Sequence, residues 1–536
     1  MRNRVFDFEL AAIAVHQQTF SVKSLLPFTL GFWLLAASAF AQLTLPDVQS
    51  ITAQAVTRAV QVSPHGVIAI VDREGFVLGV WSVDGTMPAT ATFTNLVANA
   101  IAKAGTASYL SSDQHAFTSR TAGFIVQQNF PPGVQNKPPG PLVGVNFSNL
   151  PFSDINKFKG PGSVIVFSST PGTAIVPVPA PVTGGLAGSP GGVPLFKNGR
   201  LVGGIGVAGD GDGPTAIQAN QVPDIDEDVA LAGQTGYVPA EVFLGSHVLI
   251  DGIRLPYVNS TTSLSSVIPF ASLPGASVAA YPLMAAPAPF AYPTLSLGGS
   301  TVEVRQPIMS DPIGGTINGK ARLTAAEVTN ILALAANRAR STRAGIRLPR
   351  GQVAQTFITV VNNPNADGVA PTVLGTIRTP GATLFSWDVA VQKARTAVFY
   401  SATNRAFSSR TVGFLAQSHF PPGIGDTGPG LFLGMQERFS MFRGTNPVNG
   451  AVVTNAPSID PNLPNGITIF PGGFPLYRNG ELIGAIGVSG DGIDQDDLIA
   501  ASGAKNFLPP PPIRGDQFFY SNARLTYAKF PRNPAL

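Results

Sequence analysis

The chain has 536 residues, more than one hydrophobic core usually serves, and its hydrophobic share of 44% is that of packed globular domains. Its net charge of +4 comes from 34 basic and 30 acidic residues scattered along the chain, which argues against a nucleic-acid-binding protein. The absence of cysteine excludes disulfides, thiolate catalysis and zinc sites built on sulfur.

The first 41 residues have the pattern of a secretory signal peptide. Lys23 precedes an apolar run over residues 25–39, and a small-residue A-x-A pattern then predicts cleavage after Ala41. An uncleaved membrane anchor is the alternative, although the run is short for a membrane span. We therefore expect a secreted or periplasmic protein, with no membrane segment after signal cleavage.

Two long segments of the chain occur twice in the same order. Residues 116–133 (AFTSRTAGFIVQQNFPPG) and 406–423 (AFSSRTVGFLAQSHFPPG) are identical at 12 of 18 positions. Residues 191–211 and 472–492 are identical at 14 of 21 positions. The period is far too long for a solenoid, so the pattern predicts two whole domains in tandem.

Within each copy, the periodicity predicts the order α-ββ-αα-ββ-α. In the first copy the expected helices begin at Thr44 (with capping-box partner Asp47), cover 95–109 and 118–130, and close with 224–232. The expected strands are 66–72 and 76–84, then a hairpin that turns at Asn198-Gly199. In the second copy Thr324 and Glu327 have capping-box spacing, and the hairpin turns at Asn479-Gly480.

The hairpin connections predict an α/β (α+β) fold of two tandem modules, each a mostly antiparallel sheet packed with helices. The expected divisions are a signal peptide (1–41), a first domain (42–250), a Pro/Ala/Ser-rich linker (251–320), a second domain (321–512) and a C-terminal tail (513–536). Residues 134–190 and 424–471 are expected to be inserted loops within the two copies.

Two motifs that suggest chemistry have simpler structural interpretations. Gly204, Gly206 and Gly209 spell G-x-G-x-x-G, but they lie within the second strand of a hairpin and not before a helix, which favours close strand packing. Asp210, Asp212, Asp491 and Asp494 suggest calcium without the spacing of an EF-hand loop. The acidic residues at 224–228 and 494–497 stand where helices begin and suit the helix dipole, so we expect no metal site.

Both copies resemble the GlcG/HbpS haem-binding family, also called the haem-degrading domain. The resemblance rests on residues 68–85 (IAIVDREGFVLGVWSVDG), the segments KAGTA (103–107) and KARTA (393–397), the second hairpin, and DEDVALAG (226–233). It implies a small antiparallel α/β module that oligomerises, with haem as the cofactor or another small molecule as ligand. The second copy departs from the pattern at Asn362, which replaces Asp72, and at an insert over 363–370.

The candidate ligand-binding residues are Lys103, His115, Arg120, Lys393 and Arg410. The copies share the cations Lys103/Lys393 and Arg120/Arg410, and a cation facing a cleft can bind a carboxylate or a haem propionate. A solvated helix face or a helix cap is the alternative for these residues. His115 is a candidate axial ligand to iron, although Arg405 occupies its position in the second copy.

No Ser/His/Asp, Cys/His or zinc-ligand pattern is evident, and the chain has only five histidines, so we expect no catalytic residues of these kinds. The leading hypothesis is an exported protein that binds haem or an organic anion. The alternatives are an enzyme that degrades haem or acts on an organic acid, and a non-catalytic oligomerisation module that self-associates through its repeats. If the copies have diverged, the first, which is nearer the family pattern, is the better candidate for binding.

Overall fold

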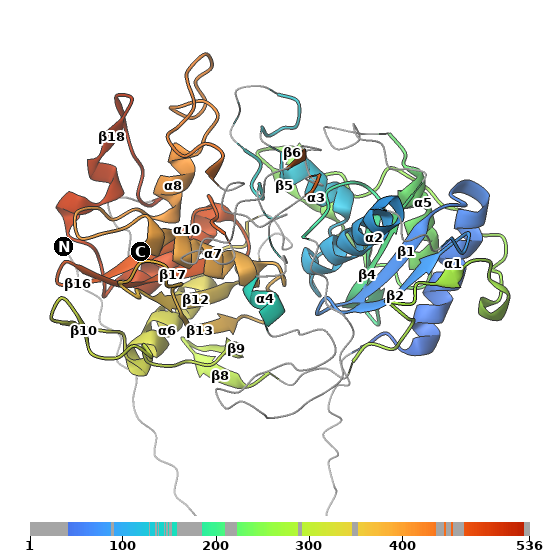
Figure 1. Cartoon of the computed structure of the whole chain (residues 1–536), viewed down its shortest axis with the longest axis horizontal. Coiled ribbons are helices and arrows are strands. Elements are labelled where there is room, and N and C mark those ends of the chain that lie inside the picture. Colours follow the sequence, from blue (N-terminus) through green and yellow to red (C-terminus); the bar gives the residue numbers. More distant parts are fainter. Residues whose placement is uncertain are drawn as a thin grey trace, which may run out of the picture. The chain divides into compact units, whose positions relative to one another are not determined.

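The first module (Figure 1) is built on an antiparallel sheet, whose strand order is β3-β4-β1-β2-β7. Its main elements are α1 (Leu45–Val62), β1 (Val67–Asp72), β2 (Val77–Ser82), α2 (Ala91–Tyr109), α3 (Ser119–Ile125), α4 (Asp154–Lys157), β3 (Gly192–Lys197), β4 (Arg200–Ala208), α5 (Ile225–Gln234), β5 (Leu249–Ile250), β6 (Ile253–Arg254) and β7 (Ala276–Ser277).

This computed structural model describes residues 41–86, 91–127, 129–134, 137, 139–143, 145, 148, 153–157, 185–209, 222–287, 292–345, 352–435, 444–445, 452–453 and 466–529. Almost all of the expected signal peptide, and the acidic residues Asp210 and Asp212, lie outside these described residues.

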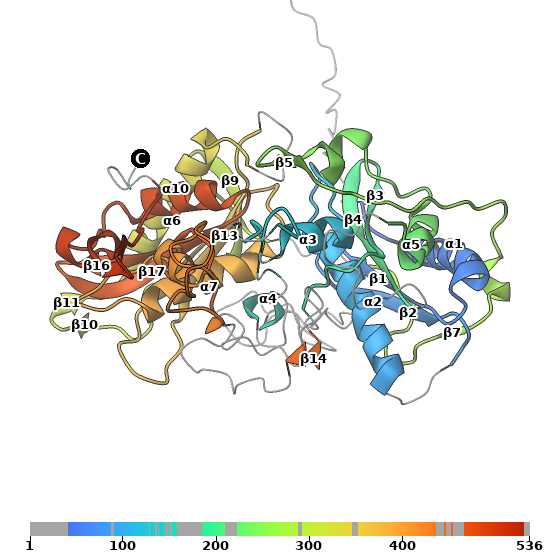
Figure 2. The same cartoon turned by 90° about the horizontal axis from the view of Figure 1, so that it is seen from above.

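The first sheet is buried on both faces because successive side chains of a strand point to opposite sides. Ile68 and Ile70 of β1 belong to a hydrophobic cluster with α1 and α5. Val67, Ala69 and Val71 belong to a different cluster with α2. Figure 2 shows the resulting layers, with α2 on one face of the sheet and α1 and α5 on the other.

The second module repeats this plan with the strand order β16-β17-β12-β13-β9-β8, again antiparallel. Its main elements are β8 (Thr294–Leu297), β9 (Ser300–Gln306), β10 (Thr316–Ile317), β11 (Lys320–Ala321), α6 (Ala325–Ser341), β12 (Phe357–Asn362), β13 (Val373–Arg378), α7 (Ser386–Phe399), α8 (Ser409–Leu415), β14 (Gly444–Thr445), β15 (Val452–Val453), β16 (Gly473–Arg478), β17 (Glu481–Ser489), α10 (Ile493–Ala504), β18 (Phe519–Tyr520) and β19 (Ala523–Arg524). The predicted fold class, two tandem α/β modules with antiparallel sheets, is confirmed.

Local signals in the sequence correspond to local structure. Both predicted capping boxes form, at Thr44 before α1 and at Thr324 before α6. Asn198 and Asn479 have positive φ angles of 54° and 51°, as the first residue of an Asn-Gly hairpin turn requires. The helix expected over 118–130 is shorter, because the carbonyls of Ile125 and Gln127 accept hydrogen bonds from a later turn instead of continuing the helix.

The expected linker over 251–320 contributes strands to both sheets. Ser277 of β7 pairs with Trp81 of β2, and Val304 of β9 pairs with Ile377 of β13. Each of these strands covers a sheet edge whose backbone groups would otherwise be unpaired. The low charge and high Pro/Ala content of this segment led to the expectation of a linker. β7 has only two residues, whereas β9 has seven and pairs with both β13 and β8.

The expected C-terminal tail over 513–536 contains a second copy of a first-module segment. In the tail Leu525 and Tyr527 are 5% and 1% exposed, and the short hairpin β18–β19 corresponds to β5–β6. Thr411 donates to the carbonyl of Thr526 (2.6 Å), as Thr121 does to the residue before Tyr257 (2.7 Å). The described part of the tail therefore packs as an integral part of the second module.

Residues 41–536 form one compact unit in which the two copies share a hydrophobic cluster. Tyr109, Phe117 and Val143 of the first copy belong to the same buried cluster as Phe385 and Trp387 of the second. Burial of apolar surface stabilises a fold roughly in proportion to the area buried. Part of the stability of each copy therefore comes from its contacts with the other copy.

Candidate functional site

The two lysines shared by the copies form the same buried ion pair. Lys103 on α2 donates to the carbonyl of Val207 (2.8 Å) and to the carboxylate of Asp226 (2.9 Å). Lys393 on α7 makes equivalent bonds, 2.7 Å to a β17 carbonyl and 2.8 Å to Asp496. These contacts join the helix on one face of each sheet to the start of the helix on the other face.

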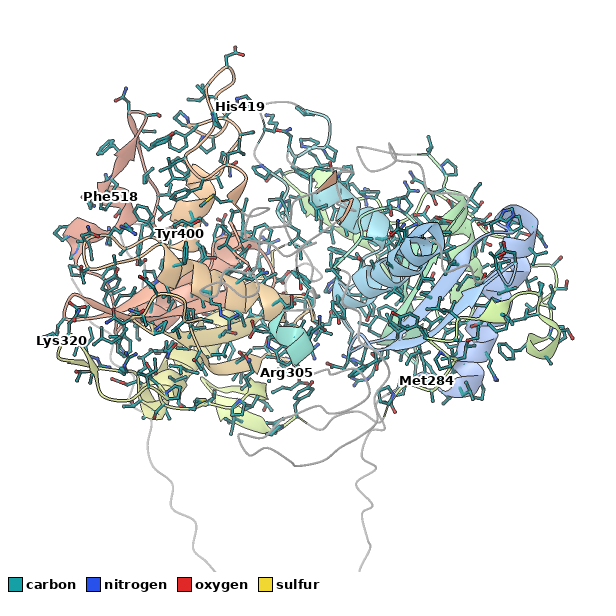
Figure 3. All side chains as sticks on the ribbon, in the orientation of Figure 1. Met284, Arg305, Lys320, Tyr400, His419 and Phe518 are labelled. Atoms are coloured by element: carbon teal, nitrogen blue, oxygen red, sulfur yellow. The ribbon has the colours of Figure 1, made fainter. Side chains whose placement is uncertain are left out.

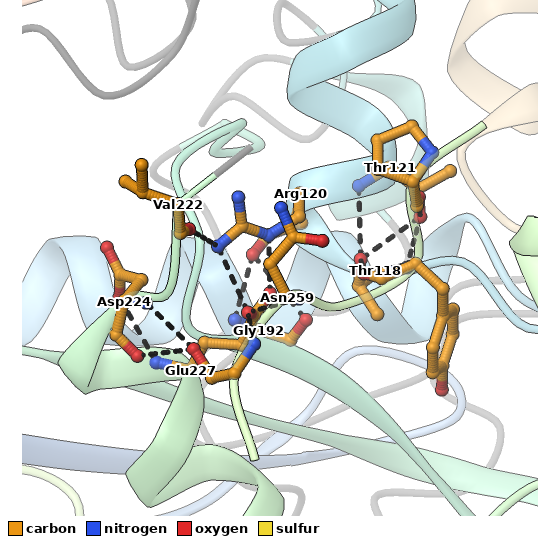
Figure 4. Close-up of polar contacts among 12 residues, drawn as sticks. Thr118, Arg120, Thr121, Gly192, Val222, Asp224, Glu227 and Asn259 are labelled. Atoms are coloured by element: carbon orange, nitrogen blue, oxygen red, sulfur yellow. Dashed lines mark hydrogen bonds and ion pairs between the residues drawn. The ribbon is translucent and has the colours of Figure 1, made fainter. Parts of the chain in front are cut away.

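Arg120 of the first copy is neutralised at the start of α5 (Figure 4). Its Nε donates to Glu227 (2.7 Å), and its Nη2 donates to the same carboxylate (3.0 Å) and to the carbonyl of Val222 (3.2 Å). The Arg120 side chain is only 3% exposed. The carboxylate also accepts the backbone N–H of Asn259 (2.8 Å), so this network is closed around Arg120.

Arg410 of the second copy has a more open setting. Its Nε donates to Asp497 (2.9 Å) and its Nη2 donates to Asp494 (2.7 Å), while the side chain is 17% exposed. Among the described residues no hydrogen bond reaches its Nη1. Because a guanidinium carries five N–H groups, Arg410 keeps donors for an external acceptor.

The charges around Arg410 balance one another. Burial disfavours its charge, but the carboxylates of Asp497 and Asp494 outweigh burial and raise the pKa of Arg410. Burial would also raise the pKa of Asp494, but hydrogen bonds from Arg410 and Lys529 lower it. Burial raises the pKa of Asp497 despite its bond to Arg410. Arg410 therefore remains a cation at any pH at which the protein is folded.

His115 is held inside the first module. Its Nε2–H donates to the carbonyl of Leu110 (2.8 Å), so Nδ1 accepts from the hydroxyl of Ser112 (2.8 Å). Both ring nitrogens are occupied and the residue is 2% exposed. An axial role on iron would require one of these bonds to break, and such a role stays a prediction.

Two glycines of the G-x-G-x-x-G motif lie where β4 packs against α2. A Cβ on Gly206 would lie 2.2 Å from the carbonyl of Ala100, and one on Gly204 would lie 2.4 Å from that of Ala104. The glycines thus let α2 lie directly on β4. In the described part of the chain, no group of three or more acidic or histidine side chains could hold a metal ion.

A cleft of about 300 Å³ lies against the second copy, and Arg410 is one of its lining residues. Its lining residues are Pro139, Gly140, Pro141, Val143, Arg410, Gly413, Phe414, Gln417, Pro422, Ile469, Phe470, Pro471, Ile493 and Thr526. A smaller cavity that shares Pro141, Phe470 and Ile493 reaches the Lys393–Asp496 pair. The structure therefore brings Lys393 and Arg410 to one apolar region, as ligand pockets usually combine an apolar lining with few polar groups.

A family model described as "Haem degrading protein HbpS-like" matches residues 43–217 and 358–505, together more than half of the chain and one region in each copy. The chain belongs to the HbpS-like family. Both predicted copies of this family are thereby confirmed.

One curated relative matches a short stretch of this HbpS-like chain. An uncharacterized 15.0 kDa protein of Citrobacter freundii, from the dhaT-dhaS intergenic region, is 43% identical over 60 residues. That match covers 11% of this chain and 42% of the relative, less than half of its length.

Solved structures resemble about a third of the chain each. The PduOC:heme complex is 25% identical and covers 34% of this chain and 94% of its own, with a TM-score of 0.21. A double mutant of Streptomyces reticuli HbpS is 20% identical, covering 37% and 87%, with a TM-score of 0.21. The Klebsiella pneumoniae protein ORFY is 19% identical, covering 38% and 95%, with a TM-score of 0.22.

Sequence reasoning missed the apolar residues that line the cleft. Ile469 and Phe470 stand where the first copy has Gly188 and Ser189, immediately before the shared hairpin segment. This exchange of small residues for large apolar ones was a visible signal of divergence between the copies. In the described part of the chain no helix is both long enough and apolar enough to cross a membrane.

Proposed function

We propose that this HbpS-like chain is an exported protein that binds haem, or another flat small molecule with a carboxylate, in the cleft of the second copy. The observation that carries the proposal is Arg410, whose Nη1 keeps N–H donors at the edge of a cleft lined by Phe414 and Phe470. Aromatic and proline side chains suit a flat apolar body, and a guanidinium suits a carboxylate such as a haem propionate.

The lining residues support contacts to the plane and edge of a porphyrin more than to its iron. Among the described residues of the cleft, none is a histidine, methionine or tyrosine, the side chains that usually ligate haem iron in the absence of cysteine. His419, labelled in Figure 3, lies on the loop after α8, and its Nδ1 is 3.0 Å from the carbonyl of Thr427. Affinity at this cleft should therefore depend little on iron.

The test is a titration of the full chain, since the copies share a hydrophobic cluster and halves would expose it. Haemin and metal-free protoporphyrin IX are followed by absorbance and by quenching of tryptophan fluorescence. We expect both to bind, with affinities within about threefold of each other. Arg410→Ala should weaken both by about tenfold or more, because a charge-assisted hydrogen bond is lost. Unchanged affinity in Arg410→Ala would overturn the proposal for this cleft.

Haem turnover is a second candidate function, favoured by the description of the matching family as haem degrading. It requires that bound haem be consumed when a reductant and oxygen are supplied. Loss of the porphyrin absorbance with formation of a product, abolished in Arg410→Ala, would support it. Stable porphyrin absorbance under these conditions would contradict turnover, and binding would remain the proposed function.

Export and self-association belong to the same proposal. The pattern over residues 1–41 supports a secreted or periplasmic location, which detection of the mature chain outside the cytoplasm would test.

The hydrophobic cluster shared by the two copies favours self-association, because it shows that such a module can bury apolar surface against a second module of the same fold. Sedimentation of the full chain would test self-association, and a monomer at all concentrations would contradict it.

A further inference from the structure

The turns that follow α3 and α8 have the same local structure in the two copies. Gly140 donates to the carbonyl of Gln127 (2.8 Å), and Gly430 donates to that of Gln417 (2.8 Å). The next pair of bonds in each turn is also equivalent, 3.1 Å in the first copy and 2.9 Å in the second. Pro141 and Val143 of the first turn therefore correspond to Leu431 and Leu433 of the second.

The surroundings of the two turns differ sharply. Val143 is 6% exposed, whereas Leu431 and Leu433 are 60% and 48% exposed. In the first-copy turn, Val143 packs in the hydrophobic cluster that contains Phe385 and Trp387 of the second copy, and Pro141 and Val143 line the cleft that also contains Arg410. In the described part of the chain, the second-copy turn has no comparable cover.

The first-copy turn is followed by a loop that includes Ser148 and residues 154–155. Two polar side chains of α7 that have no counterpart in the first copy bind this loop. Asp388 on α7 accepts from the hydroxyl of Ser148 (3.0 Å) and from the backbone N–H of Ile155 (2.9 Å). Arg395, about two helical turns further along α7, donates to Asp154 (2.5 Å). All of these side chains are nearly or fully buried.

The positions of Asp388 and Arg395 in the first copy carry no charge. They are occupied by Ala98, which is exposed, and by Gly105. A buried carboxylate or guanidinium costs free energy unless it is paired. The partners of Asp388 and Arg395 are groups of the first-copy loop, which explains why α7 carries these charges and α2 does not.

We infer that the cleft is a composite site: the second copy supplies the binding groups and the first copy supplies one wall, held by Asp388 and Arg395. The inference rests on the proposed function of the cleft and goes beyond it in assigning different tasks to the copies. One ligand site of this kind then exists per chain. Arg395 acts as a positioning residue, since it contacts the loop and does not line the cleft.

The test uses protoporphyrin IX and the full chain with matched pairs of variants. The double variant Pro141→Ala/Val143→Ala removes the wall, and Leu431→Ala/Leu433→Ala makes comparable truncations in the equivalent turn. We expect the first double variant to bind about tenfold more weakly and the second to bind within about twofold of the parent. The stoichiometry should be one ligand per chain.

A second pair of variants separates the proposed function from the composite wall. Phe414→Ala should weaken binding about tenfold, whereas Phe124→Ala, at the equivalent position, should not. Both phenylalanines make similar edge-on contacts, to Phe420 at 5.2 Å and to Phe130 at 5.8 Å, so losses of local packing are matched. Normal binding in Phe414→Ala and in the wall variant would refute the cleft itself. Weak binding in Phe414→Ala with normal binding in the wall variant would refute only the composite wall.

Hydrogen exchange tests the same inference without mutation, in case a wall variant folds poorly. Added ligand should slow exchange of the backbone amides over residues 140–143 and leave those over 430–433 unchanged. The double variant Asp154→Asn/Arg395→Gln, which keeps a neutral hydrogen-bonding pair, should retain part of this protection. Equal protection of both turns, or of neither, would overturn the inference.

Discussion

Lys393 on α7 lies 2.8 Å from Asp496 on α10, and the two side chains are 1% and 5% exposed. The bond links the helical layers on the two faces of the sheet. Lys393 also donates to a carbonyl of β17, a strand of the sheet between them. Lys103 and Asp226 repeat the arrangement at 2.9 Å in the first copy, with both side chains fully buried. The lysines are thus structural bonds between layers in both copies, and Lys393 additionally borders a small cavity.

Removing one partner of this pair should destabilise the chain strongly. Lys393→Met leaves the buried carboxylate of Asp496 without its cation, so the free energy of unfolding should fall by about 3–5 kcal/mol. The double variant Lys393→Met/Asp496→Leu should recover most of this loss, since no buried charge remains. Urea unfolding measures both. Arg200→Met, which breaks an ion pair whose arginine is 51% exposed, is the control and should cost less than about 1 kcal/mol.

An alanine at Gly487 should also be destabilising. Its Cβ would lie 1.9 Å from the carbonyl of Ala390 on α7, so the helix must move away from β17. Overpacking of this kind costs about 1–3 kcal/mol. Thermal unfolding of Gly487→Ala measures the effect, and Gly428→Ala, whose Cβ would meet nothing within 4 Å, is the control. Similar melting temperatures for both variants would contradict the contact between α7 and β17.

The capping residue Asp47 should make the first module sensitive to acid. Burial would raise its pKa, but hydrogen bonds from Lys197, Thr44 and Tyr237 lower it from 3.8 to about 2. Because the pKa is lower in the folded chain, the unfolded chain binds more protons between these values. The stabilisation is therefore complete above about pH 4 and is lost as the pH falls through about 2.

Asp47→Asn should accordingly lower stability at pH 7 and flatten its decline towards pH 2. The loss at neutral pH should be about 1 kcal/mol, the usual contribution of a helix cap. Urea unfolding at several pH values from 7 to 2 measures the profile. Asp251→Asn changes an exposed aspartate in a turn and should leave the profile as in the parent. A decline of equal steepness in the parent and in Asp47→Asn would rule out this role.

The C-terminal segment should be needed for stability. Tyr527→Ala removes a ring that is 1% exposed and lies 5.4 Å from the ring of Phe474, so we expect a loss of about 3–5 kcal/mol. Phe519→Ala, at a residue that is 69% exposed, should have little effect. Thermal unfolding measures both variants. If Tyr527→Ala has the melting temperature of the parent, the packing of Tyr527 contributes little to stability, and the segment would be the peripheral tail that the sequence predicts.

Much of the local structure could be predicted from the sequence. The capping boxes at Thr44 and Thr324 and the Asn-Gly hairpin turns depend on contacts between residues at most four apart in the chain, which a sequence pattern displays directly. The duplication, the antiparallel sheets and the family follow from segments that recur with few changes. The strand β7 could not be predicted, because its two residues leave no period to detect. The seven-residue strand β9 (STVEVRQ), which follows a Gly298-Gly299 turn, did carry an alternating pattern that the expected linker overlooked.

The candidate site also has features that the sequence predicts and features that only the fold determines, for a different physical reason. The sequence by itself determined which cations the copies share, Lys103/Lys393 and Arg120/Arg410, since identity needs only alignment. Only the tertiary structure decided that Arg120 is enclosed by Glu227 while Arg410 borders a cleft. That difference depends on which loop packs beside each guanidinium. Residues more than 200 positions apart, such as Asp154 and Arg395, meet there through folding alone.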